Sequence, residues 1–381
     1  MQYPATMSVA ADHVPGKRER LAAGVARSGL LPLLAACRRL RRGDLRILAY
    51  HRVVERIDAE GFRFDPELLS ADAAGFRAQM QHVKRHYTPL RLAEAMARLD
   101  AGEALPPGAL VVTFDDGYDD NYRVAFPILR ELGMPATFFV STGYIDSGLP
   151  YHYDWFVHVL SAAQVAAIEI PELGHASTLP AGLRARQRLA QELISRLKSL
   201  DDEAQIQVID RLARDCGMPR VAPAADCRPM TWEQLREMHA GGMEIGSHGV
   251  GHRMLAKLDD AELTAEIVGS RDAIGRALGT PARVISYPVG GSDAWDERVV
   301  AAARAAGYVA GCSYLAGSND PRRLDRFGLR RLPVERTTSL EVLSAMAAVP
   351  EWFGYASRAP RKPAGTGQAA AGRSPAAAGV R

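Results

Sequence analysis

Cysteine is scarce in this chain of 381 residues, which has four cysteines and no C-x-x-C pair. Four cysteines at these spacings do not resemble the disulfide framework of a small secreted domain, so the fold has to depend on a hydrophobic core. A reducing compartment is the simpler inference, and a pair between Cys216 and Cys227 is left open.

Long hydrophobic runs are also missing. The uncharged stretch Ser28–Cys37 is far too short to span a bilayer. Its end resembles a lipoprotein cleavage site, but basic residues before and directly after it oppose export. We expect residues 1–44 to be a basic helical extension, with an amphipathic helix over 17–43 that either contacts an anionic membrane surface or is simply solvated. The expected location is cytoplasmic, with a peripheral contact with the membrane and export both left open.

A strong net charge is absent as well. The formal charge is +3, and the basic excess lies at the two ends, because residues 47–356 carry 33 Lys and Arg against 41 Asp and Glu. A net negative body argues against nucleic acid as the main substrate. The end of the chain, residues 351–381, is rich in Ala, Gly and Pro and is predicted to be a disordered tail.

What the chain does contain is an alternation of apolar strands and helices. Strands are predicted at 45–54, 111–114, 136–141, 243–247, 283–287, 308–313 and 328–334, with helices between them, including one over 74–100. This pattern predicts an α/β fold, a distorted (β/α) barrel of about seven mainly parallel strands. From about 150 to 229 the alternation lapses, so we expect a helical insertion there that shapes the substrate groove of a catalytic domain over 45–350.

The strand at 111–114 leads directly into two carboxylates, Asp115 and Asp116, followed by Gly117. Barrel enzymes place their chemistry where strands end, so this is a candidate active site. Neighbouring side chains on a strand point in opposite directions, so the two acids are expected to have different roles. The alternative is a helix N-cap, although a cap uses one residue and these acids end an apolar strand.

A second strand end carries two histidines, His248 and His252, on a backbone with glycines between them. Two histidines that converge with one carboxylate make a metal site with open positions for water and substrate. An H-x-x-x-H spacing is weak evidence alone, but it gains weight beside the strand-end Asp pair.

Thr113–Gly117 together with Ser247–His252 resembles the polysaccharide deacetylases, the NodB-homology domain of carbohydrate esterase family 4, over about residues 45–335. The resemblance implies a divalent metal, usually zinc, and hydrolysis of N-acetyl or similar acyl groups on amino sugars of a polysaccharide or lipid-linked glycan. It also implies that Asp116, His248 and His252 bind the metal and that Asp115 is the general base. A backbone N–H just after the acids, that of Tyr118, is the expected oxyanion donor.

Two family features are missing. The family's Arg-x-Pro-x-Gly motif appears as Ser286–Gly290, which keeps Tyr287, Pro288 and Gly290 as expected substrate or oxyanion residues but lacks the arginine that steadies the base. Arg330 and Arg52 are candidates to replace it, and spacing supports neither. The C-terminal Leu-x-His motif that carries the acid is also absent.

His51 is the candidate for the missing acid. It ends the first predicted strand, and in a closed barrel the first and last strands are neighbours. Poly-N-acetylglucosamine deacetylases, which resemble this chain, have a permuted motif order with a similar Tyr-His near the start. A nearby carboxylate is expected to raise the pKa of His51 and favour proton donation. The alternative is a histidine hydrogen-bonded for structural reasons.

Two other functions compete with this hypothesis. A non-catalytic carbohydrate-binding relative would explain the missing acid, but binding alone needs no base such as Asp115. Another metal-dependent amidase or peptidase is the second alternative, and the lack of a His-Glu-x-x-His helix counts against the common zinc peptidases.

Overall fold

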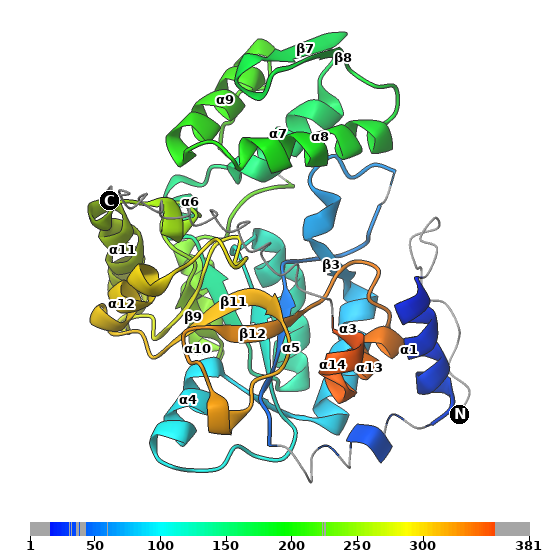
Figure 1. The fold of residues 1–381 in the computed structure, drawn as a ribbon, viewed down its shortest axis with the longest axis vertical. Helices are drawn as coiled ribbons and strands as arrows, with labels where there is room; N and C mark the ends of the chain where they lie inside the picture. Colours follow the sequence, from blue (N-terminus) through cyan, green and yellow to red (C-terminus); the bar gives the residue numbers. More distant parts are fainter. Residues whose placement is uncertain are drawn as a thin grey trace, which may run out of the picture.

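The computed structural model describes residues 16–29, 31, 33–35, 38, 43–58, 60–222, 224 and 226–354. Within them, parallel strands form a barrel with helices around it, and a helical lobe is set off at the top of Figure 1. Among the described residues, no helix combines the length and the apolar character that a bilayer-spanning segment requires.

The barrel is a closed ring of parallel strands. In spatial order these are β1 (Arg46–Tyr50), β12 (Leu329–Pro333), β11 (Ala310–Ala316), β10 (Val284–Ser286), β9 (Glu244–Ser247), β6 (Thr137–Val140) and β5 (Ala109–Phe114). The ring closes because β1 pairs with β5 as well as with β12. A short strand, β4 (Thr88–Leu90), adds to the start of β5. The predicted (β/α) barrel is confirmed, and its closure places the carboxyl ends of β1 and β5 side by side.

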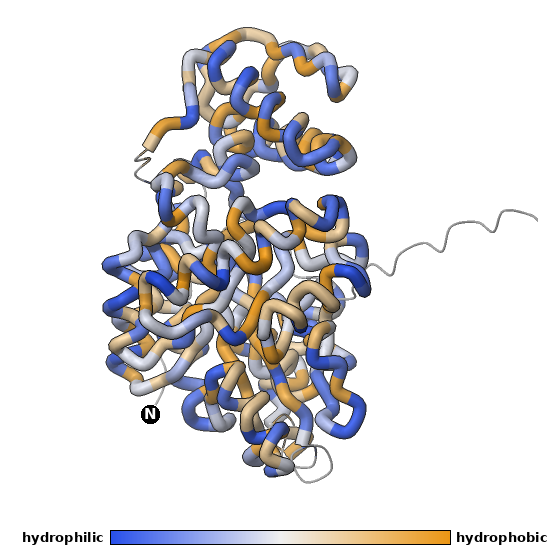
Figure 2. The backbone as a smooth tube through the Cα atoms, turned by 90° about the vertical axis from the view of Figure 1, so that its left-hand side faces the viewer, coloured by the Kyte–Doolittle hydropathy of each residue, from blue (hydrophilic) through white to orange (hydrophobic). Residues whose placement is uncertain are grey.

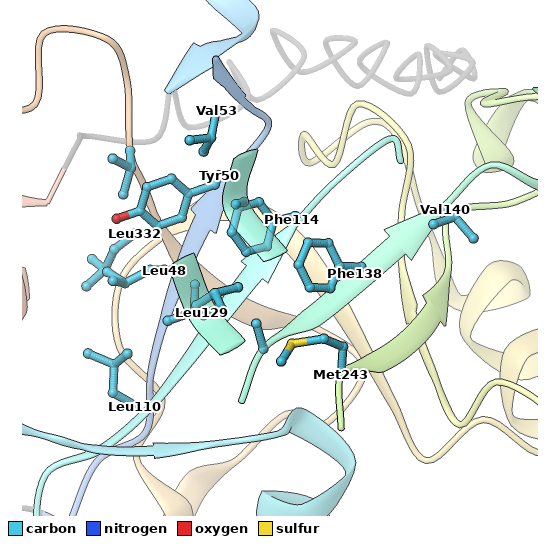
Figure 3. Packing of buried hydrophobic residues seen from close by; sticks show 14 of the residues in the cluster. Leu48, Tyr50, Val53, Leu110, Phe114, Leu129, Phe138, Val140, Met243 and Leu332 are labelled. Atoms are coloured by element: carbon cyan, nitrogen blue, oxygen red, sulfur yellow. The ribbon is translucent and has the colours of Figure 1, made fainter. Parts of the chain in front are cut away.

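The strands form because their residues are apolar and covered on both faces, and β1, β5 and β6 are buried along their whole length. Figure 3 shows the aromatic row on one face of the neighbouring strands. Phe114 stacks on Phe138 at 4.4 Å between ring centroids, and Tyr50 lies 5.4 Å from Phe114. Phe76 meets Tyr50 edge-on at 5.3 Å from the helix side. This face therefore packs against the helices, and the alternate side chains face the barrel interior.

Helices cover the outside of the barrel (Figure 1). They alternate with the strands as the sequence pattern predicts. They are α3 (Ala73–His86), α4 (Leu92–Asp100), α5 (Phe126–Leu132), α6 (Thr142–Ser147), α10 (Trp232–Ala240), α11 (Asp260–Leu278), α12 (Glu297–Ala305) and α13 (Leu340–Ala348).

Two local expectations are wrong. The predicted helix over 74–100 is divided, because Tyr87 is extended and Pro89 cannot continue a helix, so β4 separates α3 from α4. The predicted strand over 45–54 is also divided at His51. The residues after it form β2 (Arg52–Val54), which pairs with β3 (Leu69–Asp72) in a separate small sheet.

The insertion is a lobe with its own apolar core. It contains α7 (His152–Ala162), the antiparallel pair β7 (Ala167–Ile170) and β8 (His175–Thr178), α8 (Leu183–Leu197) and α9 (Asp202–Asp215). Buried side chains on one side of each helix, such as Phe156, Leu193 and Ile209, pack together. Figure 2 shows this lobe set off from the barrel. Cys216 and Cys227 are both free thiols.

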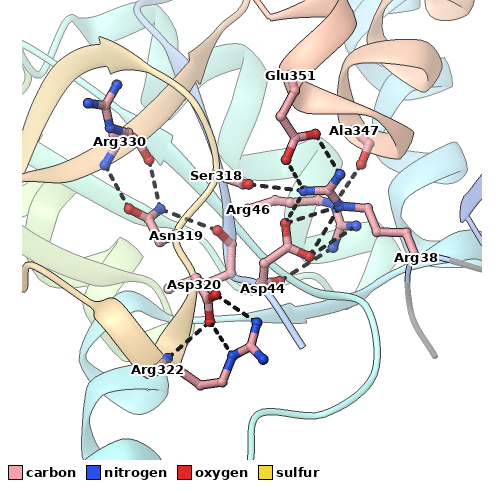
Figure 4. A network of polar contacts seen from close by, with 11 residues as sticks. Arg38, Asp44, Arg46, Ser318, Asn319, Asp320, Arg322, Arg330, Ala347 and Glu351 are labelled. Atoms are coloured by element: carbon pink, nitrogen blue, oxygen red, sulfur yellow. Dashed lines mark hydrogen bonds and ion pairs between the residues drawn. The ribbon is translucent and has the colours of Figure 1, made fainter. Parts of the chain in front are cut away.

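The N-terminal segment contacts the last helices that the structure describes. Helix α1 (Lys17–Arg27) packs against α13 and ends at Ser28, and most of residues 30–42 lie outside the described part of the chain. Arg38 forms ion pairs with Asp44 at 2.7 Å and with Glu351 at 2.5 Å, as Figure 4 shows. Glu351 belongs to α14 (Pro350–Phe353), a short helix at the start of the predicted tail.

Candidate active site

The two acids occupy the turn that follows β5. Asp115 still belongs to the strand pairing, because its N–H donates to the carbonyl of Tyr50 at 2.9 Å. The chain then turns sharply, with φ of 73° at Asp116 and 96° at Gly117. A side chain at Gly117 would place a Cβ 2.9 Å from Val140 Cγ1, so both the backbone conformation and the space require glycine. The strained φ of Asp116 is typical of a functional position.

Asp116, His248 and His252 converge at this edge of the barrel, and one ligand atom of each lies within 4.8 Å of the others. Asp116 Oδ1 lies 3.5 Å from His248 Nε2 and 3.2 Å from His252 Nε2. This oxygen is buried and accepts no hydrogen bond from the described residues. Burial alone would raise the pKa of Asp116, but the two imidazoles hold it well below its usual value.

This cluster fits a divalent metal ion. His248 Nδ1 is 2.7 Å from the carbonyl of Ser286, which fixes the tautomer and leaves Nε2 as a lone-pair donor. Two imidazole nitrogens and one carboxylate oxygen are zinc-type ligands. The orphaned oxygen of Asp116 is the acceptor that a cation would satisfy. Sequence reasoning therefore selected three residues that the fold brings together.

The loop between the two histidines is held by a buried carboxylate. Glu266 of α11 accepts the N–H of Val250 at 2.7 Å and that of Gly251 at 3.0 Å. At Gly249, φ is 75° and a Cβ would meet Glu266 Oε2 at 2.7 Å. The glycines of this loop thus let the backbone wrap around Glu266, and this wrapping directs both histidines toward Asp116.

Asp115 is paired with an arginine that the sequence analysis did not select. Arg331 of β12 donates two hydrogen bonds of 2.7 Å to the two oxygens of Asp115, and both side chains are buried. Although burial alone would raise the pKa of Asp115, Arg331 and then His248 lower it below its usual value. The pair keeps Asp115 ionised and fixed in orientation, as a base requires.

The two candidates named for this arginine were wrong. Arg330 points its guanidinium at the carbonyl of Ala316, and Arg52 pairs with Asp120 at 2.8 Å and Asp154 at 3.3 Å. Arg331 Nη2 also donates to Ser286 Oγ at 3.0 Å, the residue at the family's arginine position. The guanidinium thus reaches Ser286 from another strand. Strand periodicity could have identified Arg331 in the sequence, because Leu329 and Arg331 alternate onto the inward face of the last strand.

Tyr287, Pro288 and Gly290 form the next rim turn. Tyr287 lines the active-site pocket, but its hydroxyl donates to the carbonyl of Phe327 at 2.9 Å. Gly290 has φ of 64°, and a Cβ there would lie 2.7 Å from the backbone N of Tyr314, so it permits a tight turn. Pro288 and Gly290 do not line the pocket.

His51 lies directly after β1 and faces the same pocket, a cavity of about 200 Å³ that also exposes Asp115, Asp116 and the two histidines. Its ring is 5.4 Å from that of Tyr314. The expected direction of its pKa was wrong. Burial lowers the pKa of His51, and the charges of Asp116 and Asp115 only partly offset this effect. The carboxylates do raise it, but desolvation is the larger contribution.

Tyr118 lies two residues after Asp116, and contacts of its neighbours and of its side chain hold it in place. Its backbone N–H makes no hydrogen bond within the described residues, although its neighbours pair with residues 228 and 230. The ring lies under the guanidinium of Arg52 at 4.5 Å, and the hydroxyl is 3.3 Å from Asp154 Oδ2. An unpaired N–H two residues after Asp116 can donate to an oxyanion.

The insertion reaches this site through Asp154 of α7, a residue that sequence reasoning missed. Its two buried oxygens accept from the backbone of Asp65 at 2.5 Å, from the thiol of Cys227 at 3.0 Å, and from Arg52 and Tyr118. It therefore connects the lobe to the turn that carries the catalytic candidates. Trp155, in contrast, lies in the lobe core and donates to the carbonyl of Met218 at 3.1 Å.

Comparisons with known proteins agree with this geometry. The polysaccharide deacetylase family model matches residues 102–311. A putative polysaccharide deacetylase of Bacillus subtilis, YxkH, is 22% identical over 244 residues, 64% of this chain and 58% of that protein. The poly-beta-1,6-N-acetyl-D-glucosamine N-deacetylase of Escherichia coli K12 is 31% identical over 84 residues, 22% of this chain and 12% of the enzyme. The matches thus span less than two thirds of these curated relatives.

Among solved structures, the deacetylase PplD of Streptococcus pyogenes in complex with acetate superposes with a TM-score of 0.52 at 19% identity, covering 82% of this chain and 99% of that one. This likeness supports the fold. The family model matches more than half of the chain, and its region includes the Asp pair and both histidines. The chain therefore belongs to the polysaccharide deacetylase family, hydrolases that cleave N-acetyl amide bonds of glycans.

Proposed function

We propose that this protein is a metal-dependent deacetylase that removes N-acetyl or similar acyl groups from amino sugars of a polysaccharide or lipid-linked glycan. The observation that carries this proposal is one pocket that contains both the Asp116–His248–His252 cluster and an ionised Asp115 held by Arg331. A site that only bound sugars would gain nothing from a buried, oriented carboxylate beside a metal cluster.

Asp116, His248 and His252 would hold the ion, for which we propose zinc. An ion bound there supplies Lewis acidity toward the acyl carbonyl and acidifies water. The protein's contribution is the fixed donor set. Ser286 orients His248, and Glu266 shapes the loop that presents both histidines.

Asp115 is assigned the general base. Its carboxylate removes a proton from the water that attacks the acyl carbon. Arg331 keeps this carboxylate ionised at neutral pH and holds both of its oxygens, so the carboxylate cannot rotate away. The Tyr118 N–H is assigned to the oxygen that becomes negative during attack, and Tyr287 borders the substrate position.

His51 is assigned the acid that protonates the departing amine. Burial lowers the pKa of His51 and so favours the neutral imidazole before the reaction. The imidazole must therefore receive a proton during turnover. The proton that Asp115 takes from water is the available one. Asp115 and His51 border the same pocket, so the proton can reach the amine without leaving the site.

The remaining assignments concern the whole chain. We propose a catalytic domain over 45–350 with the insertion at about 150–229, preceded by the basic segment 1–44 and followed by the tail 351–381. The glycan is the proposed partner, and the basic segment is proposed to contact the membrane surface from the cytoplasmic side. The E. coli relative acts on poly-N-acetylglucosamine by its name, which makes N-acetylglucosamine oligomers the first substrates to test.

The test is metal content combined with acetate release. Purified protein should contain about one divalent ion per chain and release acetate from short N-acetylglucosamine oligomers, and Asp115→Asn should keep the ion and lose the release. His239→Ala is the matched control, because His239 is exposed on α10. Oligomer binding without acetate release would favour a carbohydrate-binding relative, and cleavage of peptide amides in place of sugar amides would favour another amidase.

A further inference from the structure

The pocket has a second wall, which the insertion builds. Helix α8 presents Gln191 and Ile194, and Lys198 follows at its C-terminal end; all three line the cavity that holds the catalytic groups. The spacings of three and four residues place them on one helical face. The insertion thus adds an amide and an ammonium group to a pocket whose candidate catalytic groups come from the barrel.

Lys198 is the charged residue of this wall, and its ammonium has an aromatic contact but no acceptor or acidic partner in the part of the chain that the structure describes. Its ammonium group makes no hydrogen bond there and no ion pair within 4 Å, and it lies 5.2 Å from the centroid of the Tyr153 ring. Half-burial lowers its pKa, and the more distant charges of Asp65 and Asp293 partly offset this. An ammonium group has three donors, and leaving them desolvated is costly.

A structural role at the helix end does not explain this side chain. Lysines often cap the last carbonyls of a helix. Here Lys257 fills that role from a different segment, since its Nζ donates to the carbonyls of Lys198 at 2.5 Å and Leu200 at 3.4 Å. The ammonium of Lys198 is therefore left for the cavity.

The nearby acids are already engaged. Asp65 Oδ1 accepts the N–H of Glu67 at 2.9 Å and the amide of Gln191 at 2.8 Å, and Asp154 is held by Arg52 and three other donors. Asp115 is paired with Arg331. Asp65, Asp154 and Asp115 thus have close partners, whereas the Lys198 ammonium has no hydrogen-bond or ion-pair partner among the described residues.

Lys198 is close enough to the reaction centre to touch the same substrate. The Tyr153 ring is a neighbour of both, because its centroid lies 6.4 Å from that of the His252 ring and 5.2 Å from the Lys198 ammonium. The Tyr153 hydroxyl donates a hydrogen bond to the amide oxygen of Gln205, which fixes this ring. Asp115 and Lys198 line the same cavity, so one bound sugar can contact both.

We propose that Lys198 binds an anionic substituent of the substrate, a phosphate or a carboxylate on the sugar that carries the acyl group or on its neighbour. The enzyme would then be a deacetylase of anionic glycans. A neutral sugar would leave the half-buried ammonium without an anionic partner, whereas an anion supplies both charge and acceptors. This inference rests on the proposed function.

The test compares three probes: the methyl glycoside of N-acetylglucosamine, N-acetylglucosamine 1-phosphate, and a disaccharide of N-acetylglucosamine and glucuronic acid. Wild type should prefer one of the anionic probes. Lys198→Gln should raise KM for that probe by about 10- to 100-fold, the range of a charge-assisted hydrogen bond, with kcat and the neutral probe little changed. Lys198→Arg should recover part of the loss. Whichever anionic probe responds identifies phosphate or carboxylate.

Lys257→Gln is the matched control, because Lys257 lies at the same helix end but outside the cavity, and it should leave the preference intact. Equal losses for neutral and anionic probes in Lys198→Gln, or no anionic preference in wild type, would overturn the proposal.

Calorimetric binding of the same probes to metal-loaded protein separates the anion site from the proposed deacetylase function. Lys198-dependent binding without acyl release would support the anion site and reject the deacetylase assignment. An anion held by the metal alone would bind Lys198→Gln as tightly as wild type and would also overturn the proposal.

Discussion

Replacing Arg331 with methionine tests the assignment on which catalysis most depends. The side chains of Arg331 and Asp115 are 1% and 3% exposed, and two hydrogen bonds of 2.7 Å join them. Methionine keeps much of the volume but removes all donors, so the charge of Asp115 stays buried without a partner. Breaking a buried pair in this way costs about 3–5 kcal/mol of folding free energy.

The loss should appear in both stability and turnover. We expect the melting temperature of Arg331→Met to fall by roughly 10 °C, since each kcal/mol corresponds to a few degrees in a chain of this size. Turnover should fall by about 10²–10⁴, the worth of an oriented general base. Arg331→Lys should be intermediate, because one ammonium cannot bind both carboxylate oxygens at once. Thermal unfolding of metal-loaded protein and acetate release at saturating substrate measure the two effects.

Two further variants serve as references for Arg331→Met. Arg330→Met changes the exposed neighbour on the same strand and should alter stability by no more than about 0.5 kcal/mol. Asp115→Asn combined with Arg331→Met should be more stable than Arg331→Met alone, because the unpaired charge is gone. The folded-state pKa of Asp115 is lowered, so the pair stabilises the fold above the ordinary carboxyl pKa of 3.8 and this contribution is lost in acid. If Arg331→Met kept the melting temperature and the turnover of the wild type, the proposed role of the Arg331–Asp115 pair would be refuted.

Three further predictions concern the metal, the acid and pH. His248→Ala should lose most of its bound metal while it keeps the fold, and full metal occupancy would contradict the ligand assignment. His51→Ala should retain metal and slow amide cleavage strongly, while an activated ester, whose leaving group needs no proton, should suffer much less; equal losses would make His51 a structural residue. Burial and Asp154 raise the pKa of Asp65 to about 6 from 3.8, so the folded state binds its proton more tightly and stability falls as pH rises through this interval. Asp65→Asn should therefore gain about 2–3 kcal/mol at pH 8 and nothing below about pH 4, as measured by melting temperature against pH.

The barrel and the convergence of the candidate metal-site residues could be predicted from the sequence because their signals are local. Strand–helix alternation determines a parallel arrangement, and in such a barrel the carboxyl ends of all strands meet at one rim. An Asp pair followed by Gly117, and two histidines on a glycine-containing loop, therefore had to lie at the same edge. His51 was placed near the site on the condition that the barrel closes and brings the first strand beside the last; the structure shows this pairing and also pairs β1 with β5, so that His51 and Asp115 line one pocket.

Other features were decided only by the tertiary structure, because they depend on contacts between distant segments. Arg331 meets Asp115 from 216 positions away, and only the closed barrel, with β12 turning Arg331 toward its interior, brings the two together. The pKa of His51 depends on how deeply the fold buries it, and this desolvation outweighs the carboxylates that the sequence suggested. Likewise, Asp154 and Lys198 carry no motif. They belong to the site because the insertion packs over the rim, and local sequence patterns do not encode that packing.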